Sequence, residues 1–120
     1  MVFKKFERNK ISTRVPGIRI TESTISFNAS ATYQFVKDNR FAELYFDEDE
    51  KVIGMKIVDE ETESAFPIRY YEQPHTPIVN INCKPFIDYF HILEVLGEPK
   101  TLPIEEDKET GMLLAKLKGR

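Results

Sequence analysis

The sequence is poor in the residue types that build disulfide, metal and phosphate-binding sites. Its single cysteine, Cys83, cannot form an internal disulfide, and the other soft ligands besides methionine are His75 and His91. No two of these three residues have the spacing of a zinc site, so no metal or other cofactor is expected. The five glycines are not clustered, which excludes a glycine-rich phosphate-binding loop.

Long apolar runs are also missing. The longest ones fall far short of the roughly 20 residues needed to cross a bilayer, and residues 1–5 lack the apolar region of a secretory signal. A lone cysteine fits a reducing compartment. We therefore expect a cytoplasmic protein with no membrane partner. Its length, with 41% hydrophobic and 31% charged residues, predicts a single domain over residues 1–120.

Charge is distributed unevenly along the chain. Residues 1–20 contain six basic residues against the single acid Glu7, whereas residues 43–63 contain nine acidic residues against two lysines. A basic segment at a chain end is one common way to bind a polyanion. We interpret residues 1–15 as a basic N-terminal arm, with a solvated terminus as the alternative interpretation.

Hydrophobic patterns predict the same series of elements in each half of the chain. In the first half we expect two strands, a short helix capped by Ser30 and a β-hairpin, at 18–20, 24–28, 31–37 and 41–58. A further strand is expected at 66–71, and in the second half we expect a strand, a helix and a β-hairpin at 78–82, 85–90 and 100–117. Because Pro67 cannot donate a ladder hydrogen bond, the strand at 66–71 is expected at a sheet edge or with Pro67 at its start.

The repeated order of elements indicates an internal duplication. The repeats run from about 18 to 58 and from about 78 to 117, with a period of about 54 to 57 residues. Chance similarity between two hairpins is the alternative. The chain is therefore predicted to be an α+β domain made of two pseudo-symmetric strand-helix-hairpin repeats.

This order of elements resembles that of AbrB-like swapped-hairpin transcription factors. The segments Ile25-Ser26-Phe27-Asn28 and Val79-Asn80-Ile81-Asn82 match the strand before the short helix, with Asn where Pro is common. MraZ-like relatives carry both units in one chain, as this sequence does. The resemblance implies a small β-barrel with swapped hairpins and a homodimer. The same segments also resemble a group of small archaeal and bacterial proteins.

The resemblance further implies binding to double-stranded DNA through basic residues. The candidates are Lys4, Lys5, Arg8, Lys10, Arg14 and Arg19. Arg14 and Arg19 are the stronger ones, because they flank or lie on a predicted strand and a guanidinium suits both phosphate and guanine edges. Against this stands the sequence pI near 5.5, since a dedicated DNA-binding domain is usually basic.

Protein–protein interaction and catalysis are the two other classes of function. A protein-protein interaction module would use the predicted edge strand 66–71 and the acidic hairpins to bind a partner. An enzyme is not expected, because a Cys83–His91 nucleophile pair would have to meet across a helix. The acidic turn 47–51 lacks the Gly and Glu of a calcium loop at positions 52 and 58.

Overall fold

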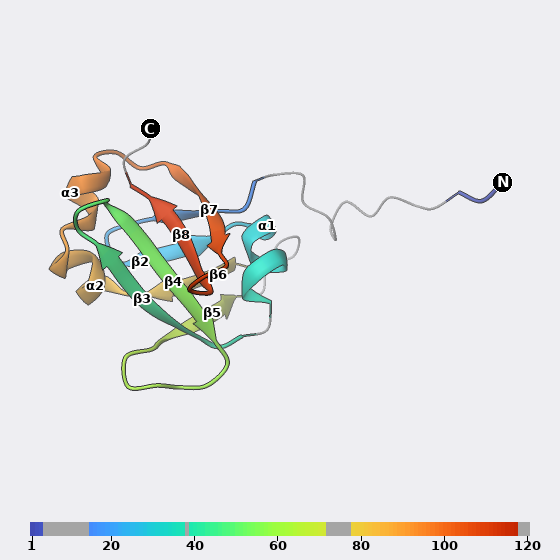
Figure 1. The fold of residues 1–120 in the computed structure, drawn as a ribbon, viewed down its shortest axis with the longest axis horizontal. Coiled ribbons are helices and arrows are strands. Elements are labelled where there is room, and N and C mark those ends of the chain that lie inside the picture. Colours follow the sequence, from blue (N-terminus) through green and yellow to red (C-terminus); the bar gives the residue numbers. More distant parts are fainter. Residues whose placement is uncertain (4–14, 38, 72–77, 118–120) are drawn as a thin grey trace.

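The computed structural model describes residues 1–3, 15–37, 39–71 and 78–117 (Figure 1). Within these ranges, eight strands and a few short helical segments follow one another. They are β1 (Gly17–Ile20), β2 (Thr24–Phe27), α1 (Ala29–Ala31), η1 (Thr32–Val36), β3 (Phe41–Asp47), β4 (Val52–Val58), β5 (Phe66–Tyr71), β6 (Ile78–Asn82), α2 (Lys84–Tyr89), α3 (Ile92–Leu96), β7 (Thr101–Asp107) and β8 (Met112–Lys116).

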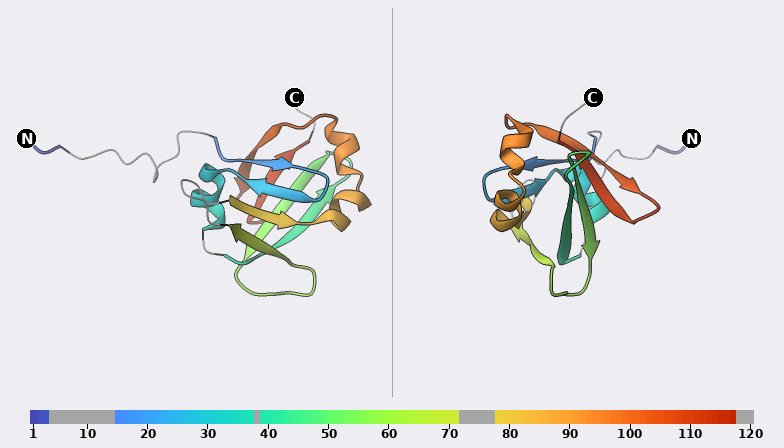
Figure 2. Two further views of the ribbon diagram at one scale, coloured as in Figure 1. Left: turned by 180° about the vertical axis from the view of Figure 1, so that it is seen from behind. Right: turned by 60° about the vertical axis from the view of Figure 1, so that its left-hand side comes forward.

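The strands form one closed antiparallel barrel, which confirms the expected small β-barrel. Their order is β1-β2-β6-β5-β3-β4-β8-β7, and β7 returns to pair with β1. Figure 2 shows the helical segments at opposite ends of the barrel, with α1 and η1 at one end and α2 and α3 at the other. The barrel thus closes within one chain, without strands from a second copy.

The pairing pattern is unchanged when the two halves of the chain are exchanged. β2 pairs with β6, and β4 pairs with β8, so equivalent strands of the two halves meet each other. β3 pairs with β5 of the other half, and β7 pairs with β1. The second hairpin of each half therefore pairs with the first hairpin of the other half.

The two long hairpins have matching turns. The carbonyl oxygens of Asp47 and Asp107 accept hydrogen bonds from the N–H groups of Lys51 and Gly111, each at 2.8 Å. Lys51 and Gly111 both adopt a left-handed backbone, with φ of 59° and 77°. These equivalent turns lie 60 residues apart, more than the period of 54 to 57 expected from the sequence. The reason is that 18 residues separate β6 from β7 and only 13 separate β2 from β3.

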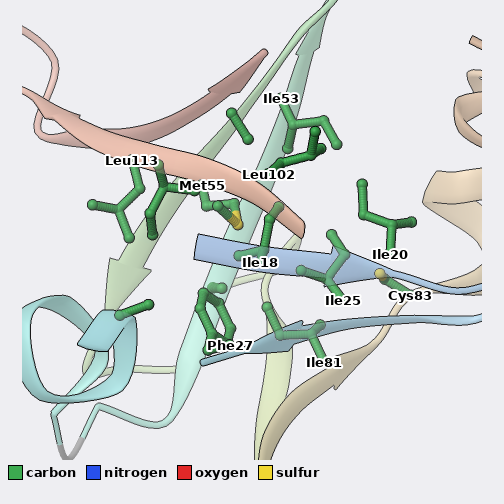
Figure 3. Close-up of a cluster of buried hydrophobic side chains, with 14 of the residues drawn as sticks. Ile18, Ile20, Ile25, Phe27, Ile53, Met55, Ile81, Cys83, Leu102 and Leu113 are labelled. Carbon is green, nitrogen blue, oxygen red and sulfur yellow. The ribbon is translucent and has the colours of Figure 1, made fainter. Parts of the chain in front are cut away.

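The barrel interior is filled by side chains from alternate strand positions. Figure 3 shows Ile18, Ile25 and Ile81 of one side of the barrel facing Ile53 and Met55 of the other side. All five are at most 1% exposed. Burial of each such side chain contributes about 1.5–3 kcal/mol. The same alternation turns the intervening residues of each strand toward solvent.

The helix expected at 31–37 begins at Ala29, and its second part is a π-helix, which is wider than an α-helix. Asn28, not Ser30, is the N-cap, because its Oδ1 accepts a hydrogen bond from the Ala31 N–H at 2.9 Å. Ser30 is buried and accepts a hydrogen bond from Gln34. After one α-helical turn the backbone widens into η1, and the Lys37 N–H reaches back to the Thr32 carbonyl at 2.8 Å.

The helix expected at 85–90 forms as α2, and a second short helix that was not expected, α3, follows it. α2 ends at Tyr89, and His91 adopts a left-handed backbone with φ of 54° before α3 begins. The ring of Phe90, at the break, packs 5.2 Å from the ring of Phe46 on β3. This contact connects the helices to the β3–β4 hairpin.

The prediction that 66–71 is an edge strand is wrong. β5 lies between β3 and β6, where Pro67 is opposite Phe41 and residues 68–71 pair with β6. Pro67 is instead at the second position of its strand, which fits the other prediction made for it. The ladder between β3 and β5 is short and comprises two residue pairs, Phe41–Pro67 and Ala42–Phe66.

Candidate nucleic-acid interface

Acidic residues are absent from the strands on one side of the barrel, which we call the acid-free side. The four neighbouring strands β1, β2, β6 and β5 contain two charged residues, Arg19 and Arg69, and no Asp or Glu. By contrast, the hairpins β3–β4 (residues 41–58) and β7–β8 (residues 101–116) together contain nine acidic residues and four lysines. Sequence order hides this polarisation, since the acid-free strands come from both halves of the chain.

A row of polar side chains crosses the acid-free side. Arg19 on β1 lies opposite Ser26 on β2, and Ser26 lies opposite Asn80 on β6. Asn80 in turn lies opposite Arg69 on β5. Because their strand neighbours, such as Ile18, are buried, these four side chains face outward. The three strand spacings place the two arginines about 14 Å apart along the sheet.

Asn80 is the one residue of this row with an unsatisfied buried atom. Its Oδ1 is buried and has no hydrogen-bond partner in the described part of the chain. Neighbouring outward positions on the two central strands, Thr24 and Asn82, are opposite each other and also polar. The centre of the acid-free side is therefore uncharged and capable of hydrogen bonding, and arginines flank it.

Asn28 fixes the point at which the chain enters β1. Besides capping α1, its Oδ1 accepts a hydrogen bond from the Gly17 N–H at 3.1 Å, and its Nδ2 donates to the Val15 carbonyl at 3.0 Å. Gly17 is held closely here, since a Cβ at this position would lie 2.8 Å from the Leu102 carbonyl oxygen. Residues 15–17 are thus held beside the end of β2, next to the polar row.

One of the six basic residues expected to contact DNA lies on this surface. Arg19 is exposed at the β1 end of the row. The other five, Lys4, Lys5, Arg8, Lys10 and Arg14, lie outside the described residues. The polar row adds three residues that sequence reasoning did not select, Ser26, Arg69 and Asn80. The alternation of 78–82 is a signal that could have assigned Asn80 to an outward position, but only the strand pairing puts it next to the arginines.

The residues considered for other chemistry lie apart. Cys83 is fully buried at the start of α2, whereas His91 is exposed and 3.8 Å from the Glu94 carboxylate. Burial raises the pKa of the Cys83 thiol to about 12, far from that of a reactive thiolate. Among the described residues, no group of three or more His, Cys, Asp or Glu side chains could hold a metal ion.

The hairpin side of the barrel carries a hollow with acidic walls. This hollow of about 760 Å³ is lined by Tyr45, Gly54, Met112 and Leu114, and by the acidic turn 47–50. Nearby, Thr62 and Tyr45 donate hydrogen bonds to the Glu43 carboxylate at 2.7 and 3.2 Å. These bonds, that of Thr62 foremost, lower the pKa of Glu43. Negative charge is thus maintained on this side.

In the described ranges, no helix is long and apolar enough to cross a membrane. Comparison with known proteins found no matching protein-family model, curated protein or solved structure. The arrangement of the residues therefore carries the functional proposal.

Proposed function

We propose that this chain is an AbrB-like swapped-hairpin protein that binds double-stranded DNA through the acid-free side of its barrel. Arg19 and Arg69 contact phosphates, together with Lys4, Lys5, Arg8, Lys10 and Arg14 of the N-terminal arm. The observation that supports this most is the absence of acidic residues from four adjacent strands that carry two arginines. The exchange of hairpins between the two halves supports the AbrB-like assignment.

The charge separation reconciles the proposal with an acidic pI. The net charge is −3, but the acidic residues that lie within strands all belong to the hairpins β3–β4 and β7–β8, and Glu22 in the β1–β2 turn lies beyond the ends of the acid-free strands. A polyanion is attracted by the local field of the surface it approaches, and charges more than about 10 Å away are largely screened at 0.1 M salt. Binding to the acid-free side is therefore compatible with the overall charge.

Salt-dependent binding to duplex DNA tests the proposal. We expect fluorescence anisotropy to give an affinity that falls steeply with salt, because each neutralised phosphate contributes about 0.9 to the log–log slope. Replacing Arg19 and Arg69 together by Gln should reduce that slope by about 2. The matched control replaces Lys56 and Lys116, which are exposed on β4 and β8, and should leave the slope unchanged.

Indifference to duplex DNA at low salt would refute the proposal and favour the second candidate, a protein-protein interaction module. The observation behind that alternative is the acid-walled hollow beside Tyr45 and Leu114. Its charge suits a cationic partner segment.

The expected homodimer is a separate question, since one chain closes the barrel alone. Sedimentation equilibrium should give twice the mass of 14.0 kDa if the homodimer forms.

A further inference from the structure

The acid-free side has two kinds of positions that match the two kinds of contacts in protein–DNA complexes. Its outer strands, β1 and β5, carry Arg19 and Arg69, which suit phosphates. Its central strands, β2 and β6, carry outward residues that are uncharged and short, among them Ser26 and Asn80. Phosphate contacts position a protein on DNA, whereas hydrogen bonds to base edges select the sequence.

The dimensions of this surface fit the major groove. The outside of a barrel is convex, so the central pair β2–β6 forms a crest between the two outer strands. A two-stranded ribbon can enter the major groove, which is about 12 Å wide, but not the minor groove, which is about 6 Å wide. With the arginines about 14 Å apart along the sheet, each can reach the backbone on one side of the groove that the crest enters.

Asn80 is the residue of the crest best suited to read a base. Its Oδ1 has no partner within the described residues although the atom is buried. An asparagine side chain can accept a hydrogen bond from adenine N6 and donate one to adenine N7 at the same time. Because Oδ1 is buried in the free chain, contact with a base requires the amide to turn outward, which the soft terminal torsion of asparagine allows.

We propose that Asn80 reads an adenine in the major groove while Arg19 and Arg69 hold the flanking phosphates. This inference rests on the proposed duplex binding and adds sequence selectivity to it. Ser26, directly opposite Asn80, lies close enough to contact the adjoining base pair. The recognised ligand is therefore a duplex with an A·T pair at a defined position.

The test begins with selection of binding sites from a random-sequence duplex library. We expect the wild-type protein to enrich sites with one fixed A·T pair, and the Asn80→Leu variant to lose that preference. In the selected duplex, 7-deazaadenine at this position removes the N7 acceptor and leaves base pairing intact. This change should weaken binding by the wild-type protein about 5- to 150-fold and should not affect Asn80→Leu.

The outcomes separate this inference from the function on which it rests. Steep salt dependence without any enriched base pair, or equal binding of adenine and 7-deazaadenine by the wild-type protein, would overturn the base contact and leave phosphate binding intact. Absence of duplex binding at low salt would overturn both. Thermal denaturation guards against misfolding, because Asn80→Leu removes an unsatisfied acceptor and should melt no lower than the wild type. The 7-deazaadenine measurement on the wild-type protein needs no variant.

Discussion

Replacing Asn28 by Ala should destabilise the whole barrel, because one side chain serves three backbone groups. The Asn28 amide caps α1 at the Ala31 N–H and also binds the Gly17 N–H and the Val15 carbonyl. Loss of a helix cap costs about 1 kcal/mol. Gly17 is buried, and leaving its N–H without a partner costs about 1–3 kcal/mol more. The Val15 carbonyl bond is exposed and adds little.

The expected total is a loss of about 2–4 kcal/mol in the free energy of unfolding. For a chain of 120 residues this corresponds to a fall in Tm of about 8–16 °C. Urea and thermal denaturation followed by far-UV circular dichroism measure both quantities. The matched control is Asn82→Ala at the exposed end of β6, where the structure gives no side-chain hydrogen bond to a described residue. A loss below about 0.5 kcal/mol for Asn28→Ala, no larger than an ordinary surface substitution, would refute this account of β1.

Three further predictions follow from the packing, the turns and the buried thiol. Gly17→Ala should lower the free energy of unfolding by about 1–3 kcal/mol, because the added Cβ would lie 2.8 Å from the Leu102 carbonyl oxygen. Urea denaturation measures this loss, and an unchanged midpoint would contradict the close contact. Both hairpin turns have a residue with positive φ, which glycine adopts more readily than lysine. In the same urea denaturation, Lys51→Gly should therefore stabilise the protein and Gly111→Lys should destabilise it, each by about 1 kcal/mol. Effects of equal sign would contradict this explanation. The pKa of the Cys83 thiol is raised by burial from 9.0 to about 12, so its stabilising contribution is full below pH 9 and is lost as the pH rises toward 12. Unfolding at pH 8 and 10 should show a loss of about 1.4 kcal/mol that Cys83→Ala abolishes, and equal losses in both proteins would contradict the assignment.

Much of the local structure could be predicted because strand alternation and turn composition act over a few residues. The hairpin of β3 and β4 is an example, since two alternating runs flank a polar turn that begins at Asp47. The second short helix, α3, that follows His91 and the widened η1 were not predicted. Both depend on packing against other elements, as the contact of Phe90 with Phe46 illustrates, and the local sequence contains no glycine or proline to mark them.

The candidate site was predicted only in part. Arg19 was selected for its place in a basic segment, whereas Arg69 and Asn80 lie about 50 and 60 residues further along the chain. Nothing local distinguishes Asn80 from the other polar residues of its strand. Its importance arises from being opposite Ser26 on one side and Arg69 on the other.

The sequence by itself determined the strands, the order of elements in each half and the basic and acidic segments, because each follows from side chains close together in the chain. The position of β5 between two strands, the exchange of hairpins and the adjacency of four strands without acidic residues emerge only from the folded barrel. The physical reason is that strand pairing and barrel closure join residues far apart in sequence. A one-dimensional pattern of hydrophobicity does not specify which strands become neighbours.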